Sequence, residues 1–81
     1  MHVEIEDFKT GWYGLMIGLK KNEINQLISA LKALRKEDNH FHIRGDYNGP
    51  GGVGDIEFYI QDENQQTNME LDLSPAIYPK D

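Results

Sequence analysis

The chain of 81 residues has room for one domain, because domains usually run from about 50 to 250 residues. Hydrophobic residues make up 38% and charged residues 27% of it, a globular balance that argues against intrinsic disorder. Eight Lys and Arg against fourteen Asp and Glu give a net charge of −6. This charge argues against free nucleic acid or an anionic membrane surface as the main partner.

The expected compartment is the cytoplasm. With no Cys, the chain can form neither disulfides nor a thiolate zinc site. Its N-terminus lacks a basic start followed by an apolar run, and no stretch approaches the ~20 apolar residues of a membrane span. We therefore expect a cytoplasmic protein without membrane association.

Alternating apolar residues predict two strands within the first nineteen residues. Val3 and Ile5 mark the first strand. The apolar side of the second strand is formed by Tyr13, Leu15, Ile17 and Leu19. Trp12 and Met16 fall on its opposite side, and the connection between the strands lies around residues 9–11.

From about Asn22 the apolar residues recur every three or four positions, the pattern of an amphipathic helix. Its apolar stripe consists of Ile24, Leu27, Ile28, Leu31 and Leu34. Asn22 is a better chemical N-cap than Lys20, whose side chain cannot accept a hydrogen bond, although Lys20 would place Glu23 at the third helical position. The sequence therefore leaves two possible N-caps for the helix, Lys20 and Asn22, which differ by two residues. Arg35 and Lys36 suit the last turn, and residues 38–39 supply the stop.

Three further half-buried strands are predicted after the helix. Their apolar positions are Phe41 and Ile43, then Ile56, Phe58 and Ile60, then Met69, Leu71 and Leu73. The connection GDYNGPGGVGD is too rich in Gly for a regular element, so we expect a long loop. Residues 74–81 contain two prolines and are expected to form an irregular tail of the same single domain, 1–81.

One helix can cover only one face of such a sheet, and an antiparallel sheet tolerates water on the other. The sequence therefore predicts a two-layer α+β domain. Its mainly antiparallel five-stranded sheet would carry the helix on one face, in the order strand, strand, helix, strand, strand, strand. The open face would collect polar side chains, among them His40, His42, Arg44, Glu57, Tyr59, Glu70 and Asp72, with Trp12 and Met16 as apolar exceptions.

Charge is segregated along the chain. Residues 20–36 hold five bases and one acid, whereas residues 55–72 hold six acids and no base. If the last two strands pair, these acids gather on one side and can steer a cationic partner into contact. The alternative is a solvated face whose charges serve solubility.

His40 and His42 lie two residues apart on a strand and therefore point the same way. A carboxylate of Glu57, Glu70 or Asp72 could complete a metal site with them. Two His without a fixed third ligand more often line a polar face or pair with acids, so we assign no metal and no cofactor.

Catalysis finds little support in the sequence. Ser29 and Ser74 have no surrounding motif of an activated nucleophile. The run NGPGGVGD lacks the following Lys and helix that a phosphate-binding loop needs. We therefore expect a binding protein and not an enzyme, with no catalytic residue.

The chain resembles the immunity proteins of bacterial polymorphic-toxin systems, most closely the immunity protein 32 family. The resemblance rests on YGLMIGLKKNEINQLISALKAL, HFHIRGD, GGVGDIEFYI and NMELDLSPAIYP, which together cover most of the chain. It implies a cytoplasmic α+β protein that binds and neutralises a cognate toxin. Many such toxins are nucleases with basic clefts, which an acidic inhibitor can occlude.

On that mechanism we expect Glu57, Glu70 and Asp72 to make electrostatic contacts with a basic toxin, and Tyr59 and Trp12 to act as desolvated anchors. Two other functions stay open. One is a self-associating domain that forms a homodimer through an open sheet face or edge. The other is a metal-binding enzyme or sensor that uses His40 and His42.

Overall fold

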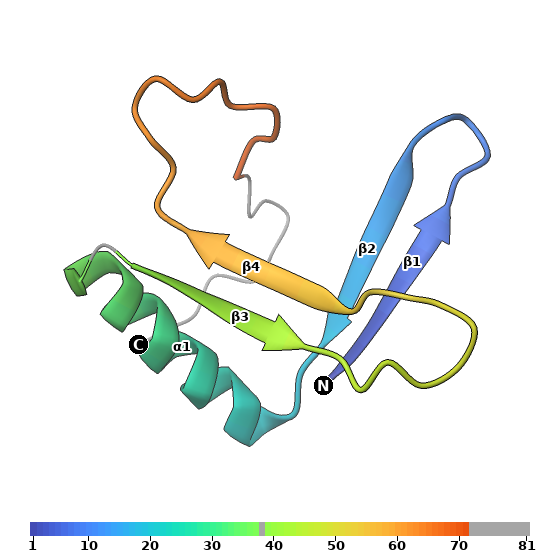
Figure 1. Cartoon of the computed structure of the whole chain (residues 1–81), viewed down its shortest axis with the longest axis horizontal. Helices are drawn as coiled ribbons and strands as arrows, with labels where there is room; N and C mark the ends of the chain where they lie inside the picture. The colour runs from blue at the N-terminus through green and yellow to red at the C-terminus, as the bar shows by residue number, and fades with distance from the viewer. Residues whose placement is uncertain (38, 72–81) are drawn as a thin grey trace.

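The computed structural model describes residues 1–37 and 39–71 (Figure 1). In chain order the elements are β1 (His2–Asp7), β2 (Tyr13–Gly18), α1 (Lys21–Glu37), β3 (His40–Arg44) and β4 (Asp55–Tyr59). This confirms the α+β class and the order of the first five predicted elements. The strands form two separate two-stranded antiparallel sheets, β1 with β2 and β3 with β4. In the described part of the chain α1 is too short and polar to cross a membrane.

The first hairpin is closed by a tight turn between β1 and β2. The Lys9 N–H donates to the Asp7 carboxylate at 2.8 Å, and the Phe8 N–H donates to the Trp12 carbonyl at 3.2 Å. Gly11 adopts a φ of 94°, a region that glycine enters without strain from a Cβ. The turn sets the register. It places four apolar side chains on one side of the hairpin, and we call this side the apolar face: Val3, Ile5, Leu15 and Ile17.

Helix α1 begins at Lys21, two residues earlier than an N-cap at Asn22 predicts. The carbonyl of Lys20 accepts hydrogen bonds from the N–H groups of Glu23 and Ile24 at 2.9 and 3.1 Å. The Glu23 carboxylate in turn accepts from the Lys20 N–H at 2.8 Å. Lys20 is therefore the N-cap, and the preference for Asn22 was wrong. The Lys side chain is not needed there, because Glu23 supplies the reciprocal half of a capping box.

The apolar interior lies between α1 and the β3–β4 hairpin. Helix α1 runs alongside β3 (Figure 1). The ring of Phe41 stacks on that of Phe58 across the two strands, with centroids 5.0 Å apart. The half-buried residues of this interior are Leu27, Ala30, Leu34, Phe41, Ile43, Ile56 and Phe58. No described residue is fully shielded from solvent.

The helix uses only part of its apolar stripe in this contact. Leu27 and Leu34 are half-buried, but Ile24, Ile28 and Leu31 keep 40 to 44% of their surface exposed. The apolar face of the β1–β2 hairpin is similarly open. Much apolar surface is therefore available to a partner.

The predicted five-stranded sheet is wrong for the described residues. Residues 69–71 of the proposed fifth strand lie outside any regular element, and Met69 and Leu71 are 82% and 90% exposed. A strand needs a neighbour to accept its backbone hydrogen bonds, and no described segment pairs with these residues. Alternation in the sequence predicts two faces but not a ladder partner. Residues 72–81, with the rest of that strand and the predicted tail, lie outside the described residues.

The long connection between β3 and β4 is the predicted Gly-rich loop, and it contains no regular element. Gly45 closes its base by donating its N–H to the Gly54 carbonyl at 2.8 Å. The Tyr47 ring covers Gly54 so closely that a Cβ there would lie 2.5 Å from the ring. Glycine at this position therefore allows the ring to close over the base of the loop.

Candidate functional site

The outward side of the β3–β4 hairpin gathers polar side chains from both strands. The register pairs His40 with Tyr59, His42 with Glu57 and Arg44 with Asp55. Because side chains alternate along a strand, these six lie opposite the apolar residues of the interior. We call this group the polar face: His40, His42, Arg44, Asp55, Glu57 and Tyr59.

Asp55 connects two basic side chains of β3. Its carboxylate oxygens both lie 3.0 Å from Nδ1 of His42, and one lies 3.8 Å from the guanidinium of Arg44. The His42 side chain is only 26% exposed. Asp55 thus holds the imidazole in one orientation between the two strands.

His40, His42 and Glu57 form a second group on the polar face. Each offers one nitrogen or oxygen atom, and the three atoms lie within 4.8 Å of one another. The two imidazoles meet edge to face, with centroids 5.2 Å apart. Among residues 1–37 and 39–71, this is the one set of three potential metal ligands found so close together.

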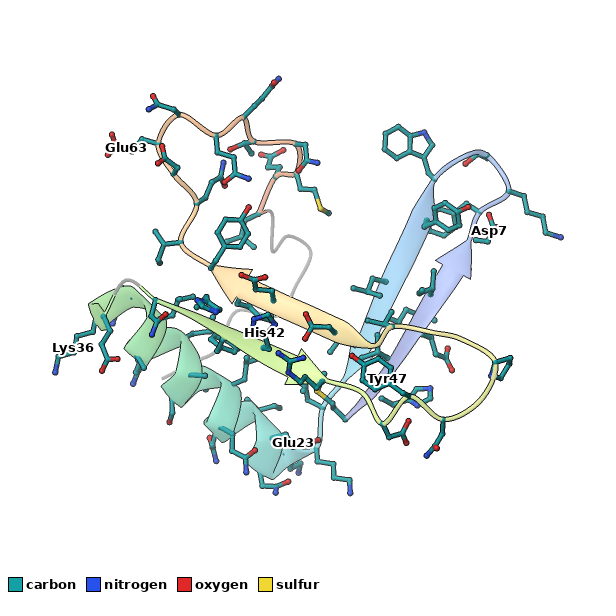
Figure 2. All side chains as sticks on the ribbon, viewed as in Figure 1. Asp7, Glu23, Lys36, His42, Tyr47 and Glu63 are labelled. Atoms are coloured by element: carbon teal, nitrogen blue, oxygen red, sulfur yellow. The ribbon has the colours of Figure 1, made fainter. Side chains whose placement is uncertain are left out.

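Tyr59 extends the polar face toward the segment after β4. Its hydroxyl accepts a hydrogen bond from the Gln65 amide at 2.6 Å, and the ring remains 51% exposed. Gln61 donates to the Gln65 carbonyl and the Thr67 hydroxyl at 2.9 and 3.0 Å. These contacts hold the acidic turn that carries Glu63 next to the end of β4 (Figure 2).

Only two of the predicted contact residues share this surface. Glu57 and Tyr59 lie on the polar face, as the alternation predicts. Glu70 is exposed but lies in the irregular segment 69–71. Asp72 lies outside the described residues.

Trp12 does not join the polar face, and its predicted place on a strand was wrong. It precedes β2, on the other hairpin, with 76% of its surface exposed. The physical reason is the turn between β1 and β2, which uses the Trp12 carbonyl as the acceptor for Phe8. The ladder therefore starts one residue later.

Sequence reasoning missed the role of Asp55. The fourth strand was predicted from Ile56, so Asp55 counted only as one acid of a charged region. Extending the alternation back by one residue would have placed Asp55 on the same side as Glu57. Its contact with His42 also depends on the register between two strands separated by the long loop, and composition does not reveal that register.

Two carboxylates outside the polar face have perturbed titration. The N-terminal ammonium of Met1, 2.8 Å away, and the Lys20 N–H lower the pKa of Glu23. A hydrogen bond from the Asn48 N–H lowers the pKa of Asp46 in the Gly-rich loop. Both groups hold local backbone in place, the first at the helix start and the second in the loop.

Comparison with known proteins found no matching family model, no matching curated protein and no matching solved structure. Inferences about function therefore rest on the resemblance noted in the sequence and on the chemistry of the surfaces described above.

Proposed function

We propose that this protein binds a basic protein toxin in the cytoplasm and neutralises it by occluding its active site, as the resemblance to immunity proteins implies. The role is binding and not catalysis. The observation that carries the proposal is the acidic, open side of β4 and the turn after it. Residues 55–71 contain five acids and no base, and every one of these acids is exposed.

Charge and shape act together in this proposal. Exposed carboxylates attract a basic cleft over a distance and take the place of the phosphates that a nuclease would bind. Tyr59 lies beside Glu57 on the polar face and offers a large ring with a polar end, a combination enriched at binding hot spots. Glu57 and Tyr59 are therefore the central contacts, and Glu70, Asp72 and Trp12 are further contacts that the sequence favours.

The experiment is capture of the tagged protein's partner from a lysate of its native host, followed by an activity assay of that partner. We expect one stoichiometric basic protein whose toxic activity disappears on binding. The variant Glu57→Lys with Glu70→Lys should then weaken binding strongly. The matched control Glu4→Lys with Glu6→Lys reverses two acids on the other hairpin and should weaken it less. Equal effects of the two variants would contradict the proposed surface.

A self-associating domain is the second candidate, favoured by the apolar face of the β1–β2 hairpin. Ile5 and Leu15 are 53% and 51% exposed there, opposite each other in the register. An isolated two-stranded hairpin is marginally stable in water, so pairing with a second copy would stabilise it. Sedimentation equilibrium should then give a dimer that Ile5→Asp dissociates and Glu4→Gln, on the opposite side, does not. A monomer at every concentration would exclude this candidate.

A further inference from the structure

The polar face presents three side chains of the types that bind transition metals. His40 and His42 come from one strand, two residues apart, and Glu57 lies directly across from His42 on the other. Their ligand atoms lie within 4.8 Å of one another. Two imidazoles and a carboxylate are also a ligand set that catalytic zinc sites use, with the fourth position left to water.

The contact between Asp55 and His42 is independent support. An ionised carboxylate only accepts hydrogen bonds, so Nδ1 of His42 must carry the proton in this contact. In the neutral ring the lone pair then lies on Nε2, the nitrogen that would bind a metal. A carboxylate that orients a ligand imidazole in this way is characteristic of metal sites and raises the basicity of the ligand.

We propose that His40, His42 and Glu57 bind one Zn²⁺ ion on the polar face, with Asp55 as the residue that positions His42 and with water in the remaining coordination. Nitrogen donors distinguish this set from the all-oxygen sites that Ca²⁺ and Mg²⁺ prefer. The proposal does not depend on the toxin-binding role, because it concerns only the side chains of this chain.

The distances can adjust to those of a zinc site without a change of backbone. Tetrahedral ligands about 2.1 Å from zinc lie about 3.4 Å from one another. The ligand atoms must therefore close by at most roughly 1.4 Å. His40 and Glu57 are exposed at the surface, so rotation about their side-chain bonds supplies that movement. The local charge also suits a cation, because the two carboxylates of Glu57 and Asp55 exceed the single positive charge of Arg44 beside them.

The test is isothermal titration of the tag-free full chain with Zn²⁺. The wild type should bind one ion per chain, and excess Mg²⁺ should not displace it. His40→Ala and His42→Ala should each weaken binding about a hundredfold, and Asp55→Asn about tenfold, the range found when an outer partner of a ligand is removed. His2→Ala is the matched control. His2 lies 2.9 Å from the Glu4 carboxylate on the other hairpin, without a second imidazole beside it in the described structure, and its loss should leave the affinity unchanged.

A second measurement locates the ion in the unaltered protein. Zn²⁺ should shift the backbone NMR resonances of β3 and β4 and leave those of β1 and β2 in place. Failure of the wild type to bind would overturn the proposal, and so would binding that persists when His40 and His42 are both replaced. Shifts centred on His2 would also overturn it, by showing that the ion binds elsewhere.

Discussion

The two hairpins of this protein are built alike but are stabilised differently. Each has two short antiparallel strands, and α1 is joined to both β2 and β3 by two-residue connections. The helix nevertheless packs on β3, and Ala30, Ala33 and Phe41 line an open pocket between the two elements. The β1–β2 hairpin keeps both of its sides open. Proximity along the chain therefore does not by itself decide which strands a helix covers.

The largest predicted effect is on stability, when an apolar residue of the interior under α1 is compared with one on the apolar face of the β1–β2 hairpin. Phe41→Ala removes a ring stacked in the half-buried interior and should lower the free energy of unfolding by about 2 to 3 kcal/mol. Leu15→Ala on the apolar face of the first hairpin should lower it by less than about 1 kcal/mol. Urea unfolding measures both values. Equal losses would mean that the first hairpin is covered in solution, as a dimer requires.

Amide hydrogen exchange compares the stability of the two hairpins in the unaltered protein. The paired amides of β3 and β4 should be protected at least about tenfold more than those of β1 and β2, a difference of about 1.4 kcal/mol in opening free energy. The reason is that α1 covers only the second hairpin. Equal protection would show that both hairpins open together.

The loops that close the two hairpins predict a smaller effect. Gly54→Ala would push a Cβ against the Tyr47 ring, which is 71% exposed and must swing aside, so the variant should destabilise the second hairpin by at most about 1 kcal/mol. Gly51→Ala, in the same loop, meets no atom within 4 Å and should be neutral or slightly stabilising, because it reduces the freedom of the unfolded chain. Thermal unfolding compares the two variants. A loss for Gly51→Ala equal to that for Gly54→Ala would argue against the packing of Tyr47.

The smallest expected effect is at the helix start between the two hairpins. The pKa of Glu23 is lowered in the folded state by the N-terminal ammonium and the Lys20 N–H. The stabilisation is therefore present above its ordinary value of 4.5 and is lost as the pH falls through the lowered pKa. Glu23→Gln should flatten the fall in unfolding free energy below about pH 4.5. Asn22→Ala should leave both that pH dependence and the stability near neutral pH almost unchanged, and a loss of about 1 kcal/mol for Asn22→Ala with none for Glu23→Gln would restore Asn22 as the cap.

Much of the secondary structure could be predicted from the sequence because it depends on neighbours along the chain. Alternating apolar residues around Val3 and Leu15 predicted β1 and β2, and those around Phe41 and Ile56 predicted β3 and β4. Apolar residues with a period of 3.6 from Ile24 to Leu34 predicted the helix. The cap could not be chosen in this way, because Asn22 has the better side chain but Glu23 completes the bond to the Lys20 backbone. The strand expected around residues 69–71 failed because its alternation has no ladder partner among the described residues.

The candidate site shows the same division. By itself the sequence determined that His40 and His42 share one side of a strand, that Glu57 and Tyr59 share one side of another, and that the acids gather late in the chain. The tertiary structure decided that these two sides coincide, that Asp55 reaches Nδ1 of His42 and that Trp12 lies on a different hairpin. The physical reason is that local periodicity assigns side chains to faces, whereas the register across a ten-residue loop and the packing of α1 depend on contacts between distant residues.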